Sequence, residues 1–305
     1  MKNIYVLGSI NMDMVINTPY MPKNGETLTG SNFFLNGGGK GANQAVAASK
    51  QGGNVKLIAS VGSDVFGSDL ITKLNEYGVN TSYTTTLEGV NTGVAMIIIE
   101  DGDNRIILDC GANGKITYQL VDNALAQANI GDVFITQLEN NFDAVLYGLK
   151  SAKTKGMTTI FNPAPAKVLD LEFFKYVDYL ILNETECEIF TGILPESEET
   201  MVEAYHKFQT MGVKNLIITL GSKGSICFSG EEKLVIKAHK VKAIDTTAAG
   251  DTYVGSFASG LALDKSVGES LNYASLCSAL TCLKKGAQQS IPTLAEVIEY
   301  QKNNL

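Results

Sequence analysis

Short apolar runs rich in β-branched residues alternate with segments of helical periodicity along most of this chain, and this alternation restricts the fold more than any other feature. From about Val55 onward, the runs are four to six residues long. A strand followed by a helix is the repeating unit of a parallel sheet, because the helix returns the chain to the edge where the next strand starts. The expected strands are 4–8, 56–60, 133–136, 158–161, 179–182 and 216–219. The expected helices are 42–50, 69–77, 118–128, 144–155, 199–211, 251–263, 267–282 and 294–301.

Two regions break this alternation. Residues 14–35 and 92–108 are expected to form strands without helices between them, with turn signals at Asn24-Gly25 and Asp101-Gly102. They would make a small β-sheet that stands off the main body as a lid. With 305 residues, the chain is near the size at which a single core stops growing. We therefore expect one α/β domain over 1–305, an αβα sandwich with a mostly parallel central sheet and this small β-sheet lid.

Charge and composition exclude several classes of function. The chain has 24 basic and 32 acidic residues, which give a net charge of −8. An acidic chain without a long basic run is poorly suited to bind nucleic acid or an anionic membrane, so we expect neither as a partner. Its apolar runs are far shorter than the ~20 residues that a membrane helix needs. The first eight residues show no signal-peptide cleavage pattern and indicate a first strand.

The cysteines and histidines give no indication of a metal centre. The five cysteines are odd in number and include no C-x-x-C pair, so they predict neither a disulfide framework nor a zinc site. Free thiols are typical of a reducing compartment, and we expect a cytoplasmic protein. His206 and His239, the only two histidines, lie among ordinary helix or strand residues. Histidine catalysis is therefore not expected.

Polar residues and glycines follow directly on several of the expected strands. In a parallel sheet the carboxyl ends of the strands meet at one edge, where ligands bind. The residues that follow strands here are Asn11, Asp13, Glu139, Asn183, Glu184, Glu186, Gly221, Ser222 and Gly224. One edge would thus gather carboxylates, amides and glycines, which suits a polar small molecule. Any single one of these residues can also be explained as a helix cap or a turn residue.

A glycine-rich run precedes the first expected helix. Residues 36–43 read Asn-Gly-Gly-Gly-Lys-Gly-Ala-Asn. The glycines let the backbone approach a ligand, while Lys40 and Asn43 offer donors and an acceptor. The run is not a phosphate-binding P-loop, because Gly41 stands where that motif has Ser or Thr. It also fits a loose dinucleotide-binding pattern, but those glycines should follow the first strand directly, and here they do not.

A second small-residue run precedes a late helix. Residues 245–252 read Asp-Thr-Thr-Ala-Ala-Gly-Asp-Thr. Small residues leave the first N–H groups of the helix uncovered at the positive end of its dipole, which makes an anion hole suited to phosphate. Asp251 could serve only to complement that dipole. A carboxylate beside a phosphate site also suggests a proton acceptor, here with an ordinary pKa of ~3.9. The residues of the expected anion hole are Ala248, Ala249, Gly250 and Asp251.

Several of these stretches match the motifs of a known family. Residues 38–45 are similar to its first signature, and residues 245–251 are similar to its second, in the form that ends Ala-Ala-Gly-Asp. Asn-Pro-Ala-Pro-Ala at 162–166 and Asn-Glu-Thr-Glu at 183–186 match further family stretches. These motifs occur in order between residues 6 and 292. The chain therefore resembles the ribokinase-like sugar kinases, also called the phosphofructokinase B type, over nearly its whole length.

The resemblance implies a ribokinase-like fold and ATP-dependent phosphorylation of D-ribose at its 5-hydroxyl group. It also implies that Asp251 is the catalytic base that accepts the proton of this hydroxyl. The positions implied to hold the sugar are Asn11, Asp13, Gly39, Lys40, Gly41, Ala42, Asn43, Glu139 and Asp251. A relative that acts on fructose, deoxyribose or a nucleoside such as adenosine remains the alternative. A non-catalytic sugar- or nucleotide-binding protein and a dinucleotide-dependent oxidoreductase also stay open.

The resemblance further implies ATP with Mg²⁺, a monovalent cation, usually K⁺, and a homodimer formed through the β lid. The positions implied to hold ATP are Asn183, Thr219, Leu220, Gly221, Ser222, Lys223, Gly224, Gly250, Asp251 and Ser275. Glu186 would hold Mg²⁺ through water. The K⁺ positions, which would act mostly through backbone carbonyls, are Asp245, Thr247, Thr281, Lys284, Gly286 and Ser290. The apolar lid run 94–99 agrees with a dimer, because a free edge should carry less hydrophobic surface.

Overall fold

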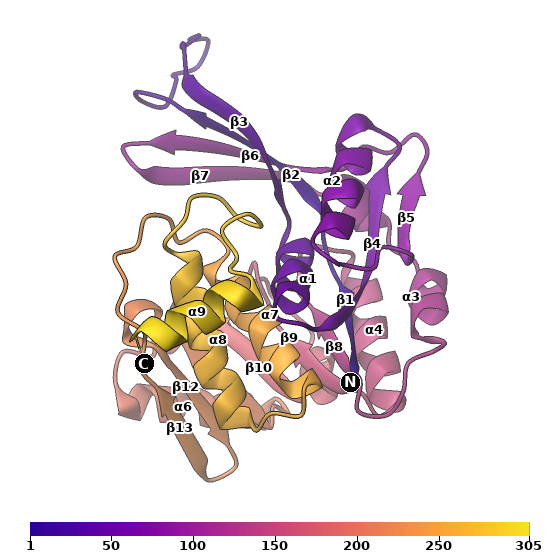
Figure 1. The fold of residues 1–305 in the computed structure, drawn as a ribbon, viewed down its shortest axis with the longest axis vertical. Helices are drawn as coiled ribbons and strands as arrows, with labels where there is room; N and C mark the ends of the chain where they lie inside the picture. Colours follow the sequence, from indigo (N-terminus) through magenta and orange to yellow (C-terminus); the bar gives the residue numbers. More distant parts are fainter. Residues whose placement is uncertain (305) are drawn as a thin grey trace.

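The computed structural model describes residues 1–304 and contains two sheets of unequal size (Figure 1). The strand order of the larger sheet is β13-β12-β11-β10-β9-β8-β1-β4-β5. Its strands are β1 (Asn3–Leu7), β4 (Asn54–Gly62), β5 (Thr84–Leu87), β8 (Val133–Thr136), β9 (Thr158–Phe161), β10 (Tyr179–Asn183), β11 (Asn215–Thr219), β12 (Ser225–Ser229) and β13 (Glu232–Ile236). The pairs β11–β12 and β12–β13 are antiparallel, and every other pair of neighbouring strands in this sheet is parallel. The mostly parallel sheet confirms the expected fold class.

Helices cover both faces of this sheet and complete three layers. Alternate residues of a strand point to opposite faces, so each central strand contributes to two cores. In β1, Ile4 and Val6 face one core, while Tyr5 and Leu7 face the other. The first core is covered by α1 (Lys40–Lys50), α2 (Val65–Glu76), α7 (Ala249–Ala262) and α8 (Val267–Thr281). The second is covered by α3 (Tyr118–Leu125), α4 (Phe142–Thr154), α5 (Glu184–Thr191) and α6 (Glu198–Thr210). Helix α9 (Leu294–Asn304) packs on α8.

The smaller sheet stands off the main body at one end of the molecule (Figure 1). Its order is β3-β2-β6-β7, with β2 (Asn11–Asn17), β3 (Ser31–Gly38), β6 (Gly93–Glu100) and β7 (Asp103–Asp109). Asp101 and Gly102 both have positive φ, at 49° and 89°, which suits the tight turn between β6 and β7. The Asn24-Gly25 signal instead falls in a long loop, because β2 ends at Asn17 and β3 begins at Ser31.

Some elements were not expected from the sequence. The hairpin of β12 and β13 and the short strand β5 lie in stretches without a clear period. Helix α5 starts at Glu184, directly after β10 ends at Asn183, so no loop residues separate the two patterns. Short 3₁₀ helices also occur at Gly111–Lys115, Leu171–Tyr176 and Gly221–Lys223. Within residues 1–304, no helix combines the length and apolar character needed to cross a bilayer.

Candidate functional site

The end of β1 and the start of α1 touch backbone to backbone. A Cβ on Gly8 would lie 2.3 Å from the Cα of Gly41, so this approach requires glycine on both sides. The Ala42 amide donates to the Ser9 carbonyl at 2.9 Å. Gly41 and Ala42 therefore pack α1 against β1 and are themselves buried. Gly39, the buried residue before α1, and Lys40, its half-buried first residue, directly precede this contact.

Glu139 follows β8 and is held by three donors. Its Oε2 accepts from the Ser9 hydroxyl at 2.6 Å, the Lys40 amide at 3.0 Å and the Asn11 side-chain amide at 3.5 Å. The Asn11 Oδ1 in turn accepts from the Asn113 amide at 2.7 Å. Asn113 was not singled out in the sequence. Its local pattern gives no signal, because the contact joins residues 102 positions apart.

Asp13, on β2, is a buried carboxylic acid near two others. Burial raises its pKa to about 7, and the negative charges of Glu139 and Asp251 act in the same direction. The structure therefore brings together Asp13, Glu139 and Asp251, which are widely separated along the chain. Lys40 is the cation among them, and although burial alone would lower its pKa, Asp251, Glu139 and Glu186 raise it overall.

Asp251 lies in the first turn of α7 and is only 8% exposed. Its Oδ2 accepts from the Asn43 amide at 2.9 Å, and its Oδ1 accepts from the Gln44 amide at 3.0 Å. Burial raises the pKa of Asp251, while Lys40 and the two amides act to lower it. The ordinary pKa expected from the sequence is thus corrected, because the tertiary structure removes this carboxylate from water. The Asn43 Oδ1 is buried and has no partner within residues 1–304.

The N-terminus of α7 opens into a cavity of about 260 Å³. Ala248 precedes the helix with φ of 61°, and the Ala249 amide donates to the Thr246 carbonyl at 3.2 Å. The Gly250 and Asp251 amides have no acceptor in the described part of the chain, as is usual in a first helical turn. Of the four expected anion-hole amides, Ala249 is therefore already engaged. The cavity is lined by Lys40, Asn162, Ala164, Ile181, Leu182, Asn183, Glu186, Thr219, Thr246, Ala248, Gly250, Asp251 and Val254.

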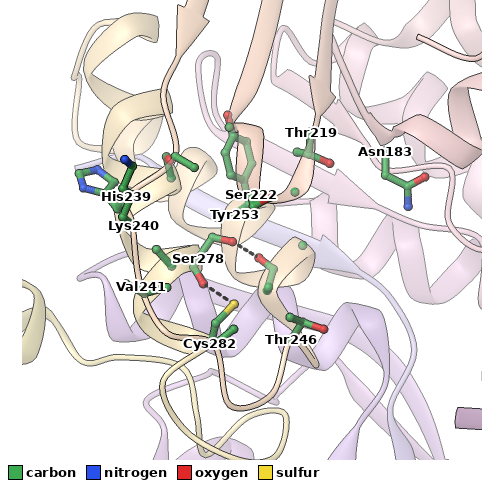
Figure 2. Close-up of a pocket in the computed structure, with 18 of the residues that line it drawn as sticks. Asn183, Thr219, Ser222, His239, Lys240, Val241, Thr246, Tyr253, Ser278 and Cys282 are labelled. Atoms are coloured by element: carbon green, nitrogen blue, oxygen red, sulfur yellow. Dashed lines mark hydrogen bonds between the residues drawn. The ribbon is translucent and has the colours of Figure 1, made fainter. Parts of the chain in front are cut away.

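A larger cleft of about 570 Å³ adjoins this cavity through shared residues (Figure 2). The residues common to both are Asn183, Thr219, Thr246 and Gly250. Of the positions expected to hold ATP, this cleft is lined by Asn183, Thr219, Gly221, Ser222, Gly224, Gly250 and Ser275. Leu220, Lys223 and Asp251 do not line it, and Asp251 lines the smaller cavity instead. Leu220 packs toward the core, and the Lys223 ammonium lies 3.5 Å from Glu184.

Nearly half of the residues that line the cleft were missed by sequence reasoning. Much of the cleft wall is apolar or small, and the side chains converge from the loop before α7, from α7 itself and from α8 (Figure 2). The Ser278 hydroxyl ties α8 to α7 by donating to the Ala249 carbonyl at 2.8 Å. The signal that the sequence offered for this wall was the set of small apolar residues just before the second small-residue run, at 245–252. The missed residues are Ala238, His239, Lys240, Val241, Ala243, Tyr253, Ser278, Ala279 and Cys282.

Asn183 and Glu186 form a reciprocal cap at the start of α5. The Asn183 Oδ1 accepts from the Glu186 amide at 2.8 Å, and the Glu186 Oε2 accepts from the Asn183 amide at 2.9 Å. Both residues also line the smaller cavity. Burial raises the pKa of Glu186, although the Asn183 amide and Lys40 act to lower it. The cap thus holds this carboxylate at the smaller cavity, next to Asn183, which also lines the cleft.

Asp245 joins two loops beside α7. Its Oδ1 accepts from the Thr247 amide at 2.9 Å and hydroxyl at 2.7 Å, and its Oδ2 accepts from the Gly286 amide at 2.9 Å. Burial alone would raise the pKa of Asp245, but these hydrogen bonds lower it overall. The Thr281 hydroxyl is committed to the Cys277 carbonyl, and the Lys284 ammonium pairs with Glu296. Both of these side chains are thus engaged within the protein.

Comparisons with known proteins agree with this geometry. A model of the pfkB family, described as carbohydrate kinases, matches residues 1–294. A ribokinase from Haemophilus influenzae is 40% identical over 300 residues and 98% of each chain. A ribokinase from Schizosaccharomyces pombe is 41% identical over 309 residues and 97% of each chain. The solved structure of Arabidopsis thaliana ribokinase complexed with ribose and ATP matches 99% of each chain at a TM-score of 0.91, with 30% sequence identity.

Proposed function

Because the chain belongs to the pfkB family of carbohydrate kinases, we propose that it transfers the γ-phosphoryl group of ATP to the 5-hydroxyl group of D-ribose. The relatives named above are ribokinases, and this chain matches them along nearly their whole length, which supports ribose as the acceptor. One observation carries the proposal from this chain's own structure. The buried carboxylate of Asp251 lies at the N-terminus of α7, in the smaller cavity that adjoins the large cleft.

The sugar binds on the Lys40 side of this carboxylate. A pentose presents several hydroxyl groups, each of which needs a donor or an acceptor once it leaves water. Asn11, Asp13 and Glu139 offer acceptors and a donor here, and the partnerless Asn43 Oδ1 offers one more acceptor. The implied contacts of Gly39, Gly41 and Ala42 are limited to their backbones.

ATP binds along the large cleft, with its γ-phosphate at the start of α7. Asp251 accepts the proton of the 5-hydroxyl while that oxygen forms a bond to phosphorus. The bond from phosphorus to the bridging oxygen breaks, and ADP leaves with that oxygen. The uncovered Gly250 and Asp251 amides stabilise the charge on the transferring phosphoryl group. Asp251 thus acts as base and also orients the acceptor.

Metal ions complete the site under this proposal. Glu186 is suited to hold Mg²⁺, because its carboxylate lines the cavity. The helix cap engages its Oε2 and not its Oε1. Bound Mg²⁺ neutralises charge on the phosphates, and Glu186 holds it through water. A monovalent cation is proposed beside the loops that Asp245 joins, because hydrogen bonds lower the pKa of this carboxylate and so favour its negative charge. K⁺ is the proposed ion, and it would hold these loops in place beside α7.

The small sheet acts as a lid over the sugar and joins two copies of the chain. Its edge strands β3 and β7 carry exposed apolar side chains, including Phe33, Ile106 and Ile107. The apolar run 94–99 lies wholly on β6, where Met96 is exposed and the other five residues are buried or half-buried, whereas every residue of β7 is exposed. A homodimer would bury this surface. We also propose a cytoplasmic location, which the five free cysteines support.

A substrate panel tests the proposed function. ADP release is coupled to an optical readout with ribose, fructose, 2-deoxyribose and adenosine, each in K⁺ and in Na⁺ at equal ionic strength. Ribose should give the highest kcat/KM, and K⁺ should raise it. A higher value with another acceptor would reassign the substrate. Ribose binding in calorimetry without ADP release would indicate a non-catalytic protein, and a nicotinamide absorbance change would indicate an oxidoreductase.

A further inference from the structure

Gln44 contacts Asp251 but belongs neither to the expected site residues nor to the groups that the proposed function uses. It lies on α1 and is fully buried. Its Nε2 donates to Asp251 Oδ1 at 3.0 Å and to Asn162 Oδ1 at 3.1 Å. Its Oε1 accepts from Gln137 Nε2 at 2.6 Å. All three polar contacts of this side chain are therefore made to other buried side chains.

The neighbours of Gln44 fix which end of its amide faces Asp251. A primary amide can turn by 180° and exchange its oxygen and nitrogen, so the hydrogen-bond network decides its orientation. Gln137 donates to the Gln44 oxygen, which leaves the NH₂ group facing the carboxylate. Asn162 donates through its own Nδ2 to the Ile181 carbonyl at 2.9 Å, so its oxygen must face Gln44. These hydrogen bonds are consistent with one orientation of the Gln44 amide, in which its NH₂ group faces Asp251.

Gln44 differs from the other amide that holds Asp251. Asn43 also donates to this carboxylate, but its own buried Oδ1 has no partner among the described residues, whereas both polar atoms of the Gln44 side chain are engaged. Gln44 lines neither the cavity nor the cleft. It can therefore influence the reaction only through Asp251 and the packing around it.

We propose that Gln44 is a positioning residue that holds the Asp251 carboxylate in the orientation needed to take a proton from the acceptor hydroxyl, and that Gln137 fixes Gln44 in this role. The inference rests on the proposed function, in which Asp251 is the base. A carboxylate held at both oxygens cannot rotate, and small errors in the placement of a reacting group lower rates strongly. The two glutamines thus act in series on one catalytic group.

The same hydrogen bond affects the charge of Asp251. Burial favours its neutral form, and the charged groups that face it are Lys40 on α1, Glu139 after β8, Asp13 on β2 and Glu186 on α5. Lys40 opposes the burial effect, while the three carboxylates add to it. The Gln44 amide stabilises the anion directly, so its loss raises the pKa of Asp251. A base that must be ionised then becomes active only at higher pH.

The test compares Gln44→Met with a matched control, Gln51→Met. Gln51 is a buried glutamine at the C-terminal end of α1 that donates to the Pro292 carbonyl at 2.6 Å and has no contact with Asp251. For Gln44→Met, kcat at pH 7 should fall about 10–100-fold with the KM for ATP nearly unchanged. The acid limb of the kcat–pH profile should move up by about one pH unit, so that part of the rate returns at alkaline pH. Gln51→Met should keep the wild-type limb.

Folded Gln44→Met protein with the wild-type acid limb would overturn the inference. If this variant does not fold, Gln137→Met decides, because it leaves Gln44 in place but removes the donor to its Oε1 and so weakens its placement. A smaller shift in the same direction is then expected, and an unchanged limb would count against the role. Absence of ribose-dependent ADP release in the wild type would instead show that the proposed function is wrong. The two failures are therefore distinguishable.

Discussion

Three carboxylates and one lysine share a buried region of this protein, and their arrangement sets the chemistry of the site. The negative charge of Glu139 acts on Asp13 and Asp251, and burial adds to the cost of charging these two. Such groups destabilise a fold unless they have a function or a partner. Here the amides of Asn43 and Gln44 and the ammonium of Lys40 supply partial compensation. Site residues therefore have measurable effects on both rate and stability.

Asp251→Asn is expected to lower kcat by about 10²–10⁴ and to leave the KM for ATP nearly unchanged. The asparagine keeps the shape of the side chain but cannot accept the proton of the hydroxyl group. A coupled ADP-release assay measures both constants. Near-normal turnover would remove Asp251 from the role of base.

Asp13→Asn should stabilise the free protein while weakening ribose binding. Folding raises the pKa of Asp13 from 3.8 to about 7, so the folded protein binds a proton that the unfolded chain releases between these values. The free energy of unfolding therefore falls as pH rises through this window, and Asp13→Asn removes this fall because asparagine does not titrate. The melting temperature should rise by a few degrees at pH 8 and much less at pH 4.5.

Calorimetry with ribose provides the second measurement for Asp13→Asn, because the variant should lose affinity as it gains stability. Asp264→Asn is the control: this exposed carboxylate pairs with Lys2 at 2.7 Å, and its removal should change the melting temperature little at either pH. Equal melting temperatures for Asp13→Asn and the wild type at pH 8 would contradict the raised pKa.

At the scale of elements, the site depends on how closely α1 and α7 pack. Helix α1 carries Asn43 and Gln44, and α7 carries Asp251, so their separation sets the length of the hydrogen bonds between them. A Cβ on Gly255 of α7 would lie 2.3 Å from the Gln44 backbone oxygen and 2.7 Å from the Ala47 Cβ. The contact leaves no room for a side chain.

Gly255→Ala should therefore destabilise the protein by about 1–3 kcal/mol or more, because the two helices must move apart. Its kcat should fall as well, since Asp251 moves away from its amide donors. Gly268→Ala on α8 is the matched control: its Cβ would meet only Leu234 Cδ1, at 4.0 Å, so helix propensity should keep or slightly raise stability. Urea unfolding measures both, and similar midpoints for the two variants would refute this account of the packing.

At the scale of the whole molecule, the small sheet carries apolar side chains that a single copy of the chain would expose to water. Ile107 on the edge strand β7 is 65% exposed and pairs across the sheet with Met96, which is also exposed. Closing the lid would exclude water that could otherwise accept the phosphoryl group. A dimer built on this sheet would shield the apolar face and steady the lid.

Light scattering should give the mass of a dimer at micromolar concentration, and Ile107→Glu should shift it to a monomer with lower kcat/KM for ribose. Val168→Glu is the control, because Val168 is 96% exposed but lies outside the small sheet. The control should remain a dimer. A wild-type monomer at this concentration would contradict the proposed interface.

Local patterns in the sequence were enough to determine most of the strands and helices and the order of the motifs. Strands β8 and β9 match the expected bounds, and the main helices agree within a few residues, because hydrophobic period and turn residues act over short distances. The β12–β13 hairpin and α5 were not predicted, because short elements without separating loops show no clear hydrophobic period. The family motifs in the sequence also assigned Asp251 and Asn43 to one functional group.

Only the tertiary structure decided what surrounds those residues. The raised pKa of Asp251, the Gln137–Gln44 network, the contact of Asn113 with Asn11 and the apolar wall of the cleft all join residues far apart along the chain. Burial and hydrogen-bond geometry depend on which segments meet, and no window of neighbouring residues contains that information. The sequence therefore determined which groups are present, and the packing of α1 and α7 on the sheet determined how they are charged and aimed.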